Sequence, residues 1–167
     1  MKPLTILFIF VTFLIQAQDS AMVSYTAGIR INRVDFFIQA TRQTNFHNFR
    51  HEFGVGIGIN RTIFQQRFFP ELSYRFSYDV LQKERFSLGP AVSLFTSMYQ
   101  VNKNTNAWHF FQEGLLGFWM EYGRRYKIRL NVGAGVFTES FKSAINSRYS
   151  HHATYGYNGQ ISFSYAL

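Results

Sequence analysis

Seven charged side chains of both signs recur between residues 71 and 129, always on the polar side of a segment in which apolar and polar residues alternate. They are Glu71, Arg75, Asp79, Glu113, Glu121, Lys127 and Arg129. If the polar sides face one shared interior, these side chains either line a path for ions or pair into a structural network. An unpaired buried charge is strongly destabilising, so opposite charges in such an interior must pair. We therefore predict a structural charge network, with an ion path as the alternative.

Two adjacent histidines, His151 and His152, are the first candidates for metal ligands. A metal site needs further ligands of matching reach, and no spacing in the chain supplies them. The chain has no cysteine, which excludes thiolate zinc sites. The glycine-rich stretch GVGIGIN, at residues 54–60, lacks the pattern of a phosphate-binding loop. We predict no metal and no cofactor, and a solvated loop around the two histidines.

Composition and the first residues indicate one exported domain. The chain has 167 residues, 19% aromatic and 16% charged, with a net charge of +8. This length fits one domain, and many aromatic residues with few charges argue against intrinsic disorder. Residues 1–17 combine Lys2, an apolar run at residues 3–15 that is too short to span a membrane, and the small residue Ala17. We predict a signal peptide over residues 1–17 and a folded domain over residues 18–167, which as an exported domain meets no nucleic acid.

Apolar residues occupy every second position through most of this domain, which is the spacing of β-strands. Phe53, Val55 and Ile57, for example, share one face and alternate with three glycines. The pattern predicts eight strands, and Asn32 and Arg33 form the turn of the first hairpin, whose register the pattern leaves open. The predicted strands cover residues 23–31, 34–41, 52–60, 68–80, 86–99, 108–122, 126–138 and 155–167.

Each predicted strand has one apolar and one polar face, and the apolar faces point either into a soluble core or outward to lipid. Several strands have twelve or more residues, whereas soluble strands have about 5–6 and membrane strands about 9–11. The charges within the strands and nine of the twelve glycines fall on the polar faces. In a narrow lumen, small residues make room for long side chains from the opposite wall. These features favour apolar faces that meet lipid.

Aromatic residues gather on the apolar faces near both ends of the strands, where amphipathic rings meet the boundary between water and lipid. The two predicted girdles contain Tyr78, Phe86, Tyr122, Tyr126 and Tyr165 at one end, and Phe68, Trp108, Phe110, Tyr155 and Tyr157 at the other. Short connections at 81–84 and 123–125 contrast with longer, polar ones at 101–107 and 139–153, predicted as inner turns and outer loops. We predict an all-β fold, a closed antiparallel eight-stranded transmembrane β-barrel preceded by a signal peptide.

This pattern resembles the small eight-stranded outer-membrane β-barrel proteins of bacteria, the class of the OmpA transmembrane domain and OmpX. The last strand alternates Ile161, Phe163 and Tyr165 as in that family, although Leu167 stands where the family usually has an aromatic residue. The resemblance implies a place in the cell outer membrane. It also implies contact with outer-membrane lipids and lipopolysaccharide, and with the barrel-assembly machinery during biogenesis. It names no extracellular partner.

We expect a structural, adhesive or loop-mediated interaction role rather than an enzyme, and two alternatives stay open. Some outer-membrane barrels of this size hydrolyse acyl chains of lipid A, with a His and a Ser two residues apart and an orienting acid. His152, Thr154 and Glu139 resemble that set, with Thr in place of Ser. A soluble, exported lipocalin-like barrel would instead bind an apolar ligand, but it needs apolar side chains inside.

Overall fold

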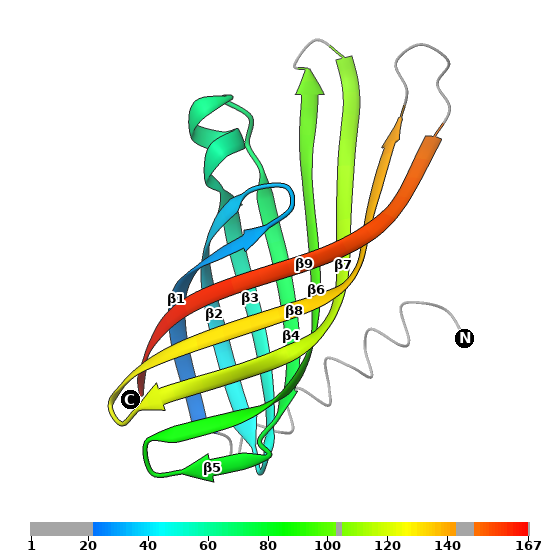
Figure 1. Ribbon diagram of the computed structural model, residues 1–167. Coiled ribbons are helices and arrows are strands. Elements are labelled where there is room, and N and C mark those ends of the chain that lie inside the picture. Colours follow the sequence, from blue (N-terminus) through cyan, green and yellow to red (C-terminus); the bar gives the residue numbers. More distant parts are fainter. Residues whose placement is uncertain (1–21, 103–104, 143–148, 167) are drawn as a thin grey trace, which may run out of the picture.

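The computed structural model describes residues 22–102, 105–142 and 149–166, and most of them lie in β-strands (Figure 1). No helix in these ranges is long and apolar enough to cross a membrane. A π-helix, η2 (Asn60–Phe64), lies between β3 and β4. The strands are β1 (Met22–Asn32), β2 (Phe36–Phe46), β3 (Phe49–Gly58), β4 (Pro70–Tyr78), β5 (Leu81–Lys83), β6 (Phe86–Asn102), β7 (Thr105–Gly123), β8 (Tyr126–Lys142) and β9 (Tyr149–Ala166).

Eight of these strands form a closed wall, in which every strand pairs antiparallel with two neighbours. The order is β1-β2-β3-β4-β6-β7-β8-β9, and β9 pairs with β1 to close the barrel. The short β5 pairs only with β6 and extends the turn after β4. The predicted eight-stranded antiparallel barrel is therefore confirmed. The predicted signal peptide lies outside the described residues and stays a prediction.

The register of the strands fixes the tilt of the barrel. A row of paired residues leaves β9 at Tyr165, passes through Tyr25, Arg42 and the following strands, and returns to β9 at Tyr155. The row thus climbs ten residues, 165 minus 155, in one circuit. A shear of this size in eight strands makes the strands tilt strongly and leaves an interior that side chains can fill.

The two rims of the barrel differ. The rim that we call the turn rim carries the connections 47–48, 79–85 and 124–125 and the last described residues of β9. The opposite rim, which we call the loop rim, carries the connections 33–35 and 59–69. In Figure 1 the turn rim is at the bottom and η2 stands at the top. An even number of wall strands places the two ends of the described barrel at the same rim.

Apolar side chains face outward and polar ones face the lumen, as the alternation predicts. Leu116 is 69% exposed on the outer surface of β7, whereas its lumen-facing neighbour Leu115 is 2% exposed. Arg30, Glu71 and Arg129 are among the most completely buried side chains of the described chain. Large aromatic residues also face the lumen, among them Phe111 and Trp119, which the alternation places on the polar face of their strand.

The first hairpin differs from the predicted one. Its connection covers residues 33–35, because the side-chain oxygen of Asn32 accepts hydrogen bonds from the backbone N–H groups of Val34 and Asp35, at 2.8 and 2.9 Å. The prediction that the second strand begins at Val34 and ends at Thr41 is therefore wrong. The strand runs over residues 36–46, and Asp35 belongs to the turn.

The strands near the loop rim are also longer than predicted. Backbone pairing continues to Asn102 and Thr105 in one hairpin and to Lys142 and Tyr149 in the other. The longer connections predicted over 101–107 and 139–153 are thus wrong, because polar residues continue the ladder there. His151 and His152 lie within β9 and not in a loop. The longest connection within the described chain is the one that contains η2.

Candidate functional site

The half of the lumen near the loop rim contains a cluster of charges around Arg30. Its guanidinium donates to both oxygens of Glu71, with an Nε–Oε1 distance of 3.1 Å, and to Glu113 at 2.7 Å. The Asn32 amide donates to the other oxygen of Glu113 at 2.9 Å, and the Gln39 amide donates to Glu71. One cation from β1 therefore joins β4 and β7 across the lumen.

A second cluster fills the half near the turn rim. Arg129 donates to both Glu52 and Glu121, and Arg75 donates to the other oxygen of Glu52 at 2.9 Å. Arg50 holds Asp79 through two hydrogen bonds, of 2.7 and 2.8 Å. Bidentate guanidinium–carboxylate pairs of this kind are the strongest type of side-chain ion pair. Arg50 also reaches Glu121 at 3.1 Å, which links the pair to the rest of the cluster.

All seven charged residues singled out from the sequence lie in these two clusters. Lys127, the most exposed of them, pairs with Glu121 at 3.1 Å near the turn rim. Arg50 was missed because the predicted strand began at Glu52, three residues after the observed start of β3 at Phe49. Together with Arg30, Arg50 and Glu52, these seven residues form a lumen network that balances five acids against five bases: Glu52, Glu71, Asp79, Glu113 and Glu121 against Arg30, Arg50, Arg75, Lys127 and Arg129. A neutral set of this kind satisfies the requirement that buried charges be paired.

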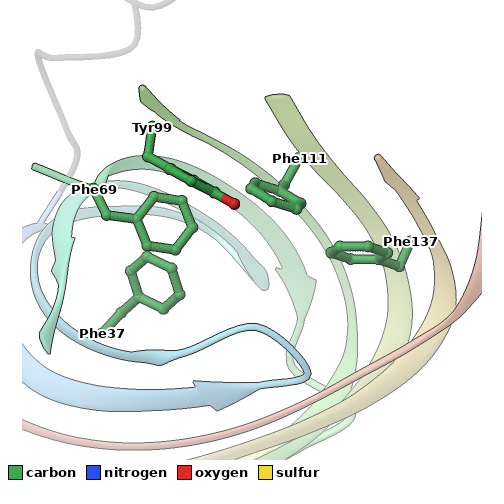
Figure 2. Packing of buried hydrophobic residues seen from close by; sticks show 5 residues of the cluster. All are labelled: Phe37, Phe69, Tyr99, Phe111 and Phe137. Atoms are coloured by element: carbon green, nitrogen blue, oxygen red, sulfur yellow. The ribbon is translucent and has the colours of Figure 1, made fainter. Parts of the chain in front are cut away.

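An aromatic cluster closes the lumen toward the loop rim (Figure 2). It contains Phe37, Phe69, Tyr99, Phe111 and Phe137, all buried, and these residues come from four wall strands and one connection. Phe69 lies in the middle, with its ring centroid 5.1 Å from that of Phe37 and 5.4 Å from that of Tyr99. The Arg61 guanidinium lies 4.2 Å from the Tyr99 ring centroid, in cation–π geometry. The one signal in the sequence was the presence of aromatic residues on otherwise polar faces.

Between the aromatic and ionic side chains little free space is left. A void lined by Gln39, Glu52, Arg75, Phe95 and Gln160 measures about 10 Å³, which is at the lower limit for one water molecule. At the turn rim, a polar depression of about 410 Å³ is lined by Arg50, Asp79, Glu121 and residues of the turns. Solvent thus meets the charge network from that side.

The connection 59–69 is fixed to the neighbouring hairpin by one carboxylate. Asp35 accepts hydrogen bonds from the backbone N–H groups of Asn60 and Arg61, both at 2.9 Å. At the other end, the Phe69 N–H donates to the Thr62 hydroxyl at 3.1 Å. Three apolar side chains of this connection point to solvent: Ile63, Phe64 and Phe68, with 62%, 76% and 65% exposed. The connection 59–69 is therefore a loop that hydrogen bonds keep ordered and that exposes apolar side chains.

The residues that resemble a hydrolase set are not assembled for catalysis. The Glu139 carboxylate lies 2.8 Å from Nδ1 of His109, and the Thr154 hydroxyl accepts a hydrogen bond from Arg33 at 2.8 Å. His152 stacks on Phe141 instead, with a centroid distance of 5.7 Å. On the outer surface, however, the Ser140 hydroxyl lies 2.8 Å from Nδ1 of His151. Within the described residues, no group of three His, Cys, Asp or Glu side chains could hold a metal ion.

The predicted girdle residues near the turn rim lie at the ends of wall strands, whereas Phe110, Tyr155 and Tyr157 lie inside β7 and β9, because these strands extend further than predicted. Phe68 lies in the connection 59–69 and not in a wall strand. Tyr78, Phe110, Tyr122, Tyr126, Tyr155 and Tyr157 are exposed on the outer surface. Phe86 and Trp108 are half-buried, and the Tyr165 side chain lies outside the described part of the chain. That these rings mark a membrane boundary stays a prediction.

Two solved structures have a similar fold. A major outer membrane protein from Thermus thermophilus matches with a TM-score of 0.50 and 10% identity, over 89% of this chain and 100% of its own. The N-terminal β-barrel domain of Pseudomonas aeruginosa OprF matches with a TM-score of 0.52 and 8% identity, over 87% of this chain and 100% of its own. No family model and no curated protein matches the sequence. At these identities the likeness concerns the fold alone, and that fold is the small outer-membrane β-barrel.

Proposed function

We propose that this protein is an integral outer-membrane barrel with a closed lumen, which supports the membrane and presents its loop rim to partners outside the cell. The observation that carries the proposal is the filled lumen, where a neutral charge network and an aromatic cluster leave a void of about 10 Å³. A barrel filled in this way neither conducts ions nor holds a small ligand. The protein then interacts with the membrane through its outer surface and with partners through its loop rim.

The outward apolar surface supports a place in the membrane. Phe118 and Ile128, on adjacent strands, are 62% and 54% exposed in the isolated chain. A contiguous apolar surface of this extent is unusual on a soluble monomer, whereas lipid would cover it. The soluble, lipocalin-like alternative needs a cavity with apolar walls, and here charged groups occupy the lumen from Arg30 to the turn rim. Outer-membrane lipids, lipopolysaccharide and, during biogenesis, the barrel-assembly machinery are the partners that this proposal implies.

The connection 59–69 is the part of the loop rim best suited to recognition. Asp35 holds its start and Phe69 anchors its end in the lumen, so Ile63 and Phe64 are presented on a fixed backbone. A loop that is ordered before binding loses less conformational entropy when a partner docks. This loop fits the structural, adhesive or interaction role better than a catalytic one.

Fractionation of the cell envelope tests the location. We expect the protein in the outer-membrane fraction, soluble only with detergent, and we expect it to migrate differently on gels before and after heating. Trypsin added to intact cells should reach Arg61 or Arg67 and no site at the turn rim. A purified chain that stays monodisperse in buffer without detergent would overturn the proposal.

One observation favours a second candidate, an acyl hydrolase that faces lipid. Ser140 and His151 form a hydroxyl–imidazole pair on the outer surface near the loop rim, and such a pair can activate a serine oxygen for attack on an ester carbonyl. Mass spectra of lipid A from cells with the wild-type protein or Ser140→Ala test it, with Ser150→Ala as the control. An acyl chain that is retained only in Ser140→Ala supports hydrolysis, and identical spectra exclude it.

A further inference from the structure

Arg42 interrupts the uncharged outer surface of the wall. Among the outward-facing side chains described in the eight wall strands, it is the one Lys, Arg, Asp or Glu. It is exposed, and it makes no hydrogen bond or ion pair with any described residue. Sequence reasoning missed it because the predicted strand stopped at Thr41. A cation that faces lipid without a protein partner indicates a partner outside the chain.

Three further polar side chains lie on the same outward face as Arg42, in β2, β3 and β4. Thr44 follows two residues later in β2 and pairs directly across from His51 in β3. Nδ1 of His51 lies 2.9 Å from the Tyr74 hydroxyl of β4. We call Arg42, Thr44, His51 and Tyr74 the Arg42 cluster. A guanidinium, two hydroxyls and an imidazole on three adjacent strands suit the oxygens of a phosphate group.

The cluster lies near the turn rim but inside the apolar band. Tyr25 pairs with Tyr165 at the end of β9, and Arg42 is the next residue of the same climbing row. Each step of this row rises by about 3 Å, so Arg42 stands about 6 Å above the level of Tyr165. An arginine side chain spans that height by extending toward the headgroup layer.

An apolar groove leads from the cluster toward the loop rim. It has a volume of about 950 Å³, and Tyr25, Arg42 and Phe53 line its lower end. It continues across Leu72, Leu94 and Val136, over successive strands that stand higher on the barrel. Gly114 leaves its floor open, because a Cβ atom there would meet only the Leu94 side chain, at 3.8 Å. The groove thus starts beside Arg42 and rises toward the loop rim.

We propose that the Arg42 cluster binds the phosphate of an anionic phospholipid in the leaflet at the turn rim, and that an acyl chain of this lipid lies in the groove. The inference rests on the proposed membrane location. Charge complementarity selects this occupant, because Arg42 is the one charged group among the outward-facing side chains that the structure describes in the wall strands. Arg42 donates to the phosphate oxygens, and Thr44 adds a hydroxyl donor.

Native mass spectrometry of the refolded barrel tests the proposal, with phosphatidylglycerol or phosphatidylcholine added to the detergent micelles. We expect the wild-type barrel to retain phosphatidylglycerol preferentially, and Arg42→Gln to reduce the retained fraction about tenfold, since one charge-assisted pair is lost. Arg124→Gln, which removes an exposed cation at the turn rim, should leave retention unchanged. Gly114→Phe, which fills the groove, should lower retention while Arg42 is intact.

Three outcomes would overturn the proposal. Equal phosphatidylglycerol retention by wild type and Arg42→Gln would contradict the proposed lipid site. If the same samples still showed heat-modifiable migration, the proposed membrane barrel would remain supported. Equal losses in Arg42→Gln and Arg124→Gln would indicate unspecific attraction to the rim. If the wild type were a dimer and Arg42→Gln a monomer, with no change in bound lipid, the outward face around Arg42 would instead be an interface with a second copy of the chain.

Discussion

The Arg30 side chain is fully buried and forms ion pairs with two carboxylates, those of Glu71 and Glu113. We predict that Arg30→Met lowers the free energy of unfolding by about 3–5 kcal/mol, because two buried carboxylates lose their cation. Urea unfolding in micelles, followed by tryptophan fluorescence, measures this change. Arg124→Gln should alter it by less than about 1 kcal/mol, because the pair with Glu84 is exposed. Adding Glu71→Gln and Glu113→Gln to Arg30→Met should recover most of the loss, and no recovery would contradict the charge argument.

Gly89 and Gly114 provide a second test at the scale of single residues. A Cβ atom on Gly89 would clash with the Tyr78 carbonyl oxygen, whereas one on Gly114 would meet only a side chain at 3.8 Å. We therefore expect Gly89→Ala to destabilise the barrel by about 1–3 kcal/mol. Gly114→Ala should stabilise it by up to about 1 kcal/mol, since glycine weakens a strand. Equal urea midpoints for the two variants would show that the close approach at Gly89 has no energetic effect.

At the scale of elements, the connection 59–69 depends on a residue of another hairpin. Asp35 accepts three backbone N–H groups, those of Phe36, Asn60 and Arg61. We predict that Asp35→Ala speeds tryptic cleavage after Arg61 or Arg67 at least about tenfold, because each lost hydrogen bond contributes about 1 kcal/mol to holding the segment. Time courses on liposome-inserted protein measure the rate, and Glu84→Ala at the other rim is the control. Unchanged cleavage would mean that Phe69 alone anchors the connection.

The elements also show what period-two alternation can and cannot predict. Alternation identified every wall strand and the direction of its faces, because one face must meet lipid or core along its whole length. It could not locate strand ends, since polar residues such as Asn102 continue a ladder as readily as they begin a loop. Arg42 and Arg50 were missed for this reason. Phe69 was predicted within a strand over 68–80, but it belongs to the connection before β4, and only tertiary structure brings it beside Phe37.

At the scale of the whole molecule, two different layers close one lumen. The aromatic cluster lies toward the loop rim, and the charge network extends from Arg30 to the turn rim. The first layer excludes water because its walls are apolar. The second fills the lumen with paired side chains that cross it from one wall to the other. We therefore expect either layer alone to stop conduction.

This redundancy predicts the electrical behaviour of variants in planar bilayers. Wild-type protein and the double variant Phe69→Ala/Phe111→Ala should both lack unit conductance, because the double variant keeps every ion pair of the network. A variant that adds Arg75→Ser and Arg129→Ser opens both layers and should conduct, with selectivity for cations, since it leaves Glu52 without its arginine partners. Arg75→Ser/Arg129→Ser without the aromatic changes serves as the control and should stay closed. Steady conductance from the aromatic double variant alone would show that the charge network is permeable, and would restore the ion path as an interpretation of the seven charged residues.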